Sequence, residues 1–195
     1  MLQIQTIQSK DMYNNRPESH RMYYVAVVCP KEIDEKVFQL KEWMRKQFGC
    51  MVALKSPGHI TLIPPFWMDE SREDELIKTL QEINSTEKAE VRLNNFSHFG
   101  DRVLFINVNE SDSLTSLKEQ TESHFLQDFS GVIKKDERPF HPHVTIANRD
   151  VSPGTFVKAW GHFSKEKFES SFVADTISLL KLNAGKWNVI ATKKL

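Results

Sequence analysis

A short pattern of His, apolar residue, Thr and apolar residue occurs twice in this chain, at His59-Ile-Thr-Leu and again at His143-Val-Thr-Ile. Each copy lies in a stretch of apolar and β-branched residues, which is typical of a buried strand. Side chains alternate between the two faces of a strand, so each His shares a face with its Thr and the apolar residues point the other way. Burial of the apolar face in a core would therefore fix an imidazole and a hydroxyl on the opposite face.

Hydrophobic periodicity predicts that strands and helices alternate around the two motifs. Apolar residues at helical spacing predict helices over residues 31–48, 69–83 and 113–129. Ser152-Pro153 resembles an N-cap followed by a first-turn proline and opens a fourth helix. Runs of β-branched and aromatic residues predict strands over residues 22–29, 50–54, 59–63, 91–99, 103–108, 143–147, 176–182 and 187–192.

The order of these elements predicts one α+β domain built as two similar lobes. Each half of the chain holds one His-x-Thr strand followed by a helix, and no low-complexity linker separates the halves. We expect this single domain to span residues 21–195. Residues 1–20 mix polar side chains throughout, and we expect them to form a loosely ordered arm before the domain.

The charge balance limits the partners of the chain. It carries 26 Lys and Arg against 26 Asp and Glu, so no net charge draws it toward a long nucleic-acid duplex or an anionic lipid surface. One nucleotide or an RNA end remains compatible with a local site. No apolar run is long enough to span a bilayer. Cys29 and Cys50 fit the reduced thiols of a cytoplasmic protein better than a disulfide framework.

The side chains of the two motifs suit acid–base chemistry on an anion. An imidazole gives or takes a proton near neutral pH, and a Thr hydroxyl donates a hydrogen bond to an anionic oxygen. Two such pairs that face each other across a cleft would supply one base, one acid and two donors, which suits in-line phosphoryl transfer without a metal. A structural hydrogen-bonded His–Thr pair is the alternative for either motif alone. The repetition favours the functional interpretation.

Four further residues near the motifs are candidates for the same site. His141 precedes Pro142, which biases it toward an extended conformation, so it is a candidate pocket residue. Arg149 would share the strand face of the second motif if that strand ran far enough, and it could bind a phosphate oxygen; a surface arginine is the alternative. Pro64-Pro65 is expected to end the first motif strand early. Phe66 and Trp67 would then stack on a base or, as the safer interpretation, pack in the core or a hydrophobic lid.

The pair HITL and HVTI, with RPFHPHVTIANR around the second copy, resembles the two-histidine (2H) phosphoesterase superfamily, which includes 2′-5′ RNA ligase-like proteins and RNA cyclic phosphodiesterases. The resemblance implies a LigT-like fold of two pseudo-symmetric antiparallel-sheet lobes with outer helices around a central cleft. It implies chemistry without metal or cofactor on 2′,3′-cyclic phosphates or 2′-5′ linkages of an RNA terminus or small nucleotide, by hydrolysis or ligation. Carried over by position, His59 and His143 are catalytic, and Thr61 and Thr145 bind phosphate.

The expected reaction on a 2′,3′-cyclic phosphate uses the two imidazoles in opposite protonation states. Neutral His143 takes a proton from the attacking water and protonated His59 gives one to the departing oxygen, although the two roles can be exchanged. Two other classes stay open. One is a non-catalytic RNA-end or nucleotide-binding module with the same cleft. The other is a metallohydrolase using His59, His141 and His143, which lacks a carboxylate partner beside the histidines. Neither a membrane nor an obligate protein partner is indicated.

Overall fold

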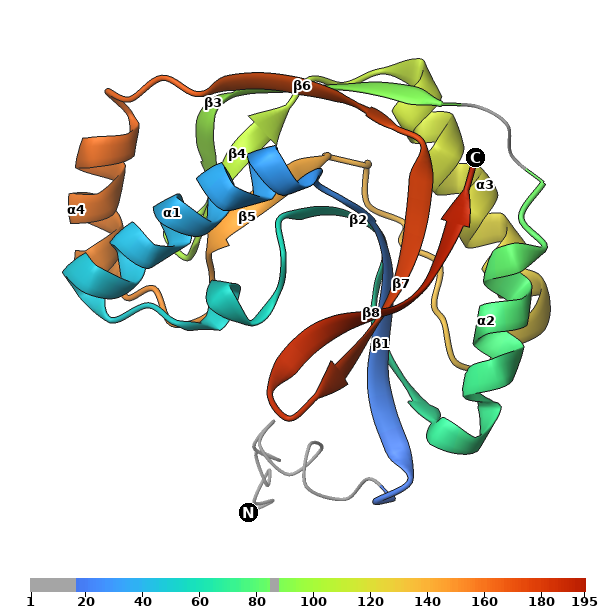
Figure 1. The fold of residues 1–195 in the computed structure, drawn as a ribbon. Coiled ribbons are helices and arrows are strands. Elements are labelled where there is room, and N and C mark those ends of the chain that lie inside the picture. The colour runs from blue at the N-terminus through green and yellow to red at the C-terminus, as the bar shows by residue number, and fades with distance from the viewer. Residues whose placement is uncertain (1–16, 85–87) are drawn as a thin grey trace, which may run out of the picture.

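The structure, a computed structural model, describes residues 17–84 and 88–195. Within these residues it contains eight strands, four α-helices and two short 3₁₀-helices (Figure 1). The elements in chain order are β1 (His20–Val28), α1 (Lys31–Phe48), η1 (Val52–Lys55), β2 (His59–Asp69), η2 (Glu70–Arg72), α2 (Glu73–Gln81), β3 (Ala89–Phe99), β4 (Val103–Val108), α3 (Asp112–Phe129), β5 (His143–Ala147), α4 (Pro153–Phe163), β6 (Glu169–Ala174), β7 (Thr176–Asn183) and β8 (Lys186–Lys194).

The strands form two four-stranded antiparallel sheets. The first sheet has the order β2-β1-β7-β8 and the second has the order β5-β4-β3-β6. Each His-x-Thr strand lies at the edge of its sheet and pairs with the strand that precedes it in the chain, β2 with β1 and β5 with β4. The two edge strands, β2 and β5, contact each other. The expected α+β fold with two antiparallel-sheet lobes is therefore confirmed, and the lobes meet at the two motifs.

Each lobe is covered by helices, and two of the helices, α1 and α3, reach across to the sheet of the other lobe. Helix α1 connects β1 to β2 of the first sheet, yet it contacts β5 of the second; α3 connects β4 to β5 of the second sheet and contacts both β3 of that sheet and β2 of the first. Helix α2 packs on β7 and β8, while α4 reaches β3 through the rings of Phe163 and Phe96 (Figure 1). Buried side chains of both sheets belong to one continuous core. The two lobes thus share their hydrophobic packing.

Local sequence signals explain why α1 forms and ends where it does. Its buried face carries apolar residues at helical spacing, among them Ile33, Val37 and Met44. Acidic residues lie in its first turn and basic residues in its last, which complements the helix dipole. Gly49 ends it with a φ of 73°, a left-handed conformation that costs glycine little, and its N–H donates to the Arg45 carbonyl.

Two strand predictions were wrong, at residues 50–54 and at Pro64-Pro65. Residues 52–55 form the 3₁₀-helix η1, whose start is held by Asp150, because its carboxylate accepts from the N–H groups of Met51 at 2.6 Å and Val52 at 2.9 Å. Strand β2 continues through Pro64-Pro65 to Asp69. An edge strand tolerates proline, and the pairing with β1 absorbs two register shifts between Tyr23 and Ala26.

Two other segments differ from the sequence expectation or fall outside it. Strand β6 was not predicted; it lies at the edge of the second sheet, half of its residues are exposed, and its sequence gives no clear apolar run. Residues 1–16 of the expected N-terminal arm lie outside the described residues, and the chain already enters β1 at His20.

Two findings bear on the cysteines and on membrane association. Cys29 and Cys50 are both buried and free. Among residues 17–84 and 88–195, no helix combines the length and apolar character needed to cross a membrane.

Candidate active site

The first motif opens β2 and is fixed by the core beneath it. His59 pairs with Val28 of β1 and Thr61 pairs with Ala26. Ile60 is fully buried and Leu62 is 1% exposed, whereas the side chains of His59 and Thr61 remain partly exposed on the other face. The strand alternation that the sequence predicted for this motif is therefore present.

The second motif repeats this arrangement on β5. His143 pairs with Asn107 of β4, and Thr145 pairs with Phe105. Val144 and Ile146 are buried in the core, while His143 and Thr145 are partly exposed. Both motifs therefore present an imidazole and a hydroxyl from an edge strand, at the place where β2 and β5 contact each other.

The two imidazoles are oriented by the same kind of hydrogen bond. The Nδ1 atom of His59 lies 2.8 Å from the Pro57 carbonyl oxygen, and Nδ1 of His143 lies 2.7 Å from the His141 carbonyl oxygen. A carbonyl can only accept, so Nδ1 carries the hydrogen in both rings. The neutral form of each ring then keeps a lone pair on Nε2, which is the atom left to exchange protons.

Aromatic side chains surround both imidazoles. The ring of Tyr24 lies 4.8 Å from that of His59. The rings of Phe105 and Phe99 lie 4.9 Å and 5.0 Å from that of His143. Tyr24 and Phe105 come from β1 and β4, the strands that pair with the two motif strands. Each catalytic candidate is thus held against an aromatic ring from the adjacent strand.

These apolar surroundings favour the neutral form of both rings. Burial lowers the pKa of His59 from its usual value of 6.5 to about 4, although its hydrogen bond to Pro57 acts in the opposite direction. The charges of Lys41 and His143 lower the pKa of His59 further. Burial also lowers the pKa of His143. The charge of one imidazole therefore opposes protonation of the other, and the protein without substrate holds both rings mainly neutral at pH 7.

A pocket of about 440 Å³ opens between the two motif strands. Its walls come from β2, from β5, from the end of β3 and from the segment before β5, and most of its surface is apolar. The lining residues are Thr61, Leu62, Pro64, Pro65, Phe99, Lys118, Asp136, Arg138, Pro139, Phe140, His141, Pro142 and His143. Thr61 and His143 therefore share one pocket, whereas His59 and Thr145 stand beside it on the same strands.

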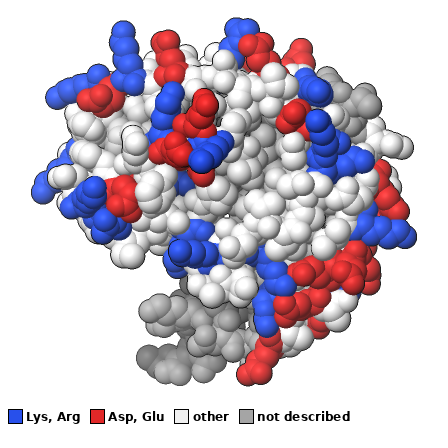
Figure 2. Space-filling view, viewed as in Figure 1, with Lys and Arg blue, Asp and Glu red and all other residues white. Residues whose placement is uncertain are grey.

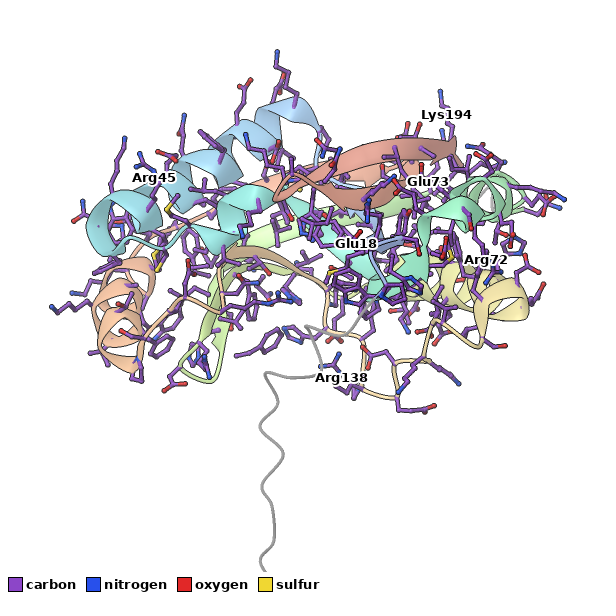
Figure 3. All side chains as sticks on the ribbon, turned by 90° about the horizontal axis from the view of Figure 1, so that it is seen from below. Glu18, Arg45, Arg72, Glu73, Arg138 and Lys194 are labelled. Carbon is purple, nitrogen blue, oxygen red and sulfur yellow. The ribbon has the colours of Figure 1, made fainter. Side chains whose placement is uncertain are left out.

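A set of charged residues at one side of this pocket was not identified from the sequence. Lys118 is buried on α3, and its Nζ donates to Glu122 at 2.7 Å. Glu122 also accepts from the backbone N–H of Asp136, whose carboxylate receives two hydrogen bonds of 2.8 Å from Arg138. The Arg138 side chain is 81% exposed and projects at the outer rim of the molecule (Figure 3). The available signal was a Lys–Glu pair at i,i+4 on the apolar face of a predicted helix.

The remaining sequence candidates fall in different places. His141 lines the pocket beside His143. The premise for Arg149 was wrong, because β5 ends at Ala147 and Arg149 has a φ of 53°; it lines a separate surface hollow with Asp101. Phe66 is in the core, with its ring 6.1 Å from that of Tyr23, which fits the safer interpretation.

Trp67 is partly buried on β2, where it pairs with Met22, and it does not line the pocket. Within the described part of the chain, no group of three or more His, Cys, Asp or Glu side chains is arranged to hold a metal ion. The set of His59, His141 and His143 that the metallohydrolase alternative required is therefore not assembled as a ligand cluster.

Comparisons with known proteins agree with this geometry. A model of the 2′-5′ RNA ligase superfamily matches residues 30–186. A protein of Geobacillus sp. (strain WCH70), named as a phosphoesterase, is 30% identical over 152 residues, covering 76% of this chain and 83% of the relative. The RNA 2′,3′-cyclic phosphodiesterase of Bacillus subtilis (strain 168) is 25% identical, covering 86% and 91%. The crystal structure of E. coli LigT complexed with 3′-AMP has the same fold, with a TM-score of 0.62 at 20% identity, covering 90% and 98%.

Proposed function

This chain belongs to the 2′-5′ RNA ligase superfamily of two-histidine phosphoesterases, and from this premise we propose that it opens 2′,3′-cyclic phosphates, or cleaves 2′-5′ linkages, at RNA ends or in small nucleotides. The observation that carries the proposal is the matched orientation of His59 and His143. Each donates Nδ1–H to the carbonyl two residues before it, and each leaves Nε2 available on adjoining edge strands. Two proton carriers oriented alike, one lining the pocket and the other beside it on the contacting strand, suit a reaction that needs a base and an acid together.

We assign the base to His59 and the acid to His143, which exchanges the roles first expected from the sequence. In a site that holds one proton, that proton resides mainly on the imidazole with the higher pKa. The charge of His143 is among the causes that lower the pKa of His59 to about 4, whereas the charge of His59 is not among those that lower the pKa of His143. His143 therefore carries the proton, and His59 is neutral.

The proposed hydrolysis of a 2′,3′-cyclic phosphate runs as follows. Nε2 of His59 takes a proton from a water molecule as its oxygen forms a bond to phosphorus. The bond from phosphorus to the 2′ or 3′ oxygen breaks, and that oxygen receives the proton from Nε2 of His143. The product is a phosphomonoester, and the two imidazoles have exchanged protonation states. The anionic phosphate raises the pKa of both rings when it binds, which supports protonation of His143.

The two Thr hydroxyls are proposed to stabilise charge on the phosphate. Thr61 and Thr145 share strand faces with the two imidazoles, and both side chains are partly exposed. A hydroxyl can donate to a non-bridging oxygen, where negative charge is held during the reaction. Each lobe would then supply one proton carrier and one hydrogen-bond donor.

The substrate is proposed to be a small nucleotide or the end of an RNA rather than a long strand. The pocket is mostly apolar, with Phe99 and Phe140 among its lining residues, which suits a nucleobase. The chain carries equal numbers of acidic and basic residues, and on the face drawn in Figure 2 the two charge signs are interspersed without a continuous basic track. A phosphate backbone of many residues would need such a track.

A panel of nucleoside 2′,3′-cyclic phosphates and 2′-5′ dinucleotides, incubated with the protein in EDTA, tests this proposal. We expect turnover of at least one substrate, and loss of that turnover in the double variant His59→Asn, His143→Asn. Tight nucleotide binding with no product from any substrate would instead establish the non-catalytic binding module. Turnover by the double variant equal to that of the wild type would refute the assigned residues.

A further inference from the structure

Two charged side chains of α1 lie against the turn that precedes His59. Lys41 is only 3% exposed, and its Nζ donates to the Ser56 carbonyl oxygen at 2.9 Å. About two helical turns before it on α1, the carboxylate of Asp34 accepts from the backbone N–H of Gly58. A cation and an anion from one helix therefore bind peptide groups on either side of Pro57, whose carbonyl orients the His59 ring.

The polar backbone groups around Pro57 each have a hydrogen-bond partner. Pro57 has no N–H to satisfy, and its carbonyl accepts from His59. The Gly58 carbonyl accepts from the N–H of Cys29 at 2.8 Å. Together with the bonds to the two α1 side chains, these contacts fix the carbonyl of Ser56 and both polar groups of Gly58. Only the Pro57 carbonyl is left to hold the catalytic ring.

The close approach of α1 to this turn depends on a glycine. A Cβ atom placed on Gly58 would lie 3.1 Å from Oδ1 of Asp34 and 3.3 Å from two side-chain carbons of Val37. Such contacts are tighter than ordinary packing, so a side chain here would push the helix and the turn apart. The sequence places the one residue without a side chain where the carboxylate must reach the backbone.

We propose that Lys41 and Asp34 are positioning residues that set the orientation of His59. This inference rests on the proposed function for its catalytic consequence. By fixing the turn on both sides of Pro57, the two side chains hold the acceptor of the Nδ1–H bond in place. His59 is thereby kept in the tautomer whose Nε2 can act as the base. In addition, the ammonium group of Lys41 opposes the gain of a second positive charge on the nearby imidazole.

Lys41 lies close enough to the carboxylate of Asp34 for that charge to raise its pKa against the effect of burial. It forms no ion pair within the part of the chain that the structure describes. Lys118, the buried lysine of α3, is by contrast paired with Glu122 at 2.7 Å. Burial lowers the pKa of Lys41 to about 8, so it is still mostly protonated at pH 7. Its charge is therefore available to act on His59.

The other titratable groups that face His59 do not supply this effect. The Tyr24 phenol from β1 has its pKa raised by burial, so it is neutral at pH 7. His143 from β5 lowers the pKa of His59, but only when it is itself protonated. Lys41 from α1 is thus the one charge among these three that persists while His143 is neutral.

The test uses the full chain with Lys41→Met, which removes the charge and the hydrogen bond but keeps an unbranched side chain of similar length. Lys36→Met is the matched control, because it makes the same substitution on the exposed face of the same helix. Ring ¹⁵N spectra recorded over pH report the pKa and tautomer of His59 without any substrate. For Lys41→Met we expect a His59 pKa above that of the wild type and partial loss of the Nδ1–H tautomer; for Lys36→Met we expect neither.

Kinetics on a substrate from the panel above provide the catalytic readout. We expect Lys41→Met to lower kcat on the order of tenfold with little change in KM, because substrate contacts are kept while the base is misoriented. The acid limb of its pH profile should move to higher pH. Asp34→Ala provides a second variant: it removes the acceptor of Gly58 and should lower kcat in the same way. If Lys41→Met does not fold, the ring spectra and the kcat of Asp34→Ala test the positioning of His59 on their own.

Unchanged titration and tautomer of His59 in the folded variants would overturn the inference. The spectroscopic arm needs no turnover, so it separates failure of this inference from failure of the proposed function. A protein without any phosphoesterase activity could still show the shifted His59 titration, and an active enzyme could fail to show it.

Discussion

The low pKa of His59 implies that the folded protein loses stability in mildly acidic solution. Burial lowers this pKa from 6.5 to about 4 in the folded state, whereas the unfolded chain keeps the usual value. Between these two values the unfolded chain binds a proton that the folded protein does not. The free energy of unfolding therefore rises with pH across this window, and it falls as the pH drops from 6.5 toward 4.

The size of the effect follows from the two pKa values. At pH 5 the folded His59 is still neutral, while the unfolded imidazole lies about 1.5 pH units below its pKa. At about 1.36 kcal/mol per unit this amounts to a loss of about 2 kcal/mol relative to neutral pH. Because the His59 side chain is partly exposed, solvent screening makes this an upper limit. A loss of this size is a large fraction of the stability of a typical domain.

Urea unfolding of the wild type and of His59→Asn at pH 7 and pH 5 measures this effect. The Asn amide can still donate to the Pro57 carbonyl but does not titrate. We expect the wild type to lose up to about 2 kcal/mol more than the variant over this pH change. Other titrating groups affect both proteins alike. Equal losses in the two proteins would refute the inferred burial of an uncharged imidazole.

Three further outcomes follow from the site. The pH optimum of kcat/KM should lie below 6.5, because the pKa values of both His59 and His143 are lowered in the free protein. The optimum of kcat should lie at higher pH. Steady-state profiles in which kcat/KM is highest above pH 7 would contradict this prediction. Thr61→Val and Thr145→Val should each lower kcat on the order of a hundredfold in the same assay, and a change confined to KM would exclude their role in stabilising charge. Arg149→Met should leave kcat/KM within about twofold of the wild type, and a larger loss would place this residue in the site despite its separate surface position.

The sequence predicted best those elements whose signals are local. Helix α1 was predicted to the residue, because its apolar stripe is bounded by Pro30 and by Gly49. The two motif strands were predicted for the same reason, and alternation alone placed each imidazole beside its Thr. The start of α4 at Pro153 was likewise indicated by Ser152, whose side chain accepts from the N–H of Thr155.

The errors arise where packing and strand pairing with distant parts of the chain, rather than local sequence, set the structure. Pro64-Pro65 was expected to end β2, but β2 is an edge strand and the two prolines lie where its pairing with β1 shifts register, so neither proline has a paired residue on β1. Arg149 was placed by extending a strand that in fact ends at Ala147. Such a boundary depends on what β4 can pair with, and the sequence of β5 alone does not contain that information.

The residues that support the site were also out of reach of pattern analysis. Lys41 occupies the apolar stripe of α1, where a lysine would ordinarily extend to solvent. Its role becomes visible only when the turn before His59 is seen to lie against that stripe. Lys118 was missed for the same reason on α3.

The packing of α1 and α3 across the lobes has a mechanical consequence. Because α1 is connected to the first sheet and packs on the second, and α3 packs on both sheets, a hinged opening of the two lobes would break helix–sheet contacts. We therefore expect little closure of the lobes when substrate binds, so that the fold itself sets the distance between the two imidazoles. A phosphoester substrate must then fit between two imidazoles whose separation does not adjust to it.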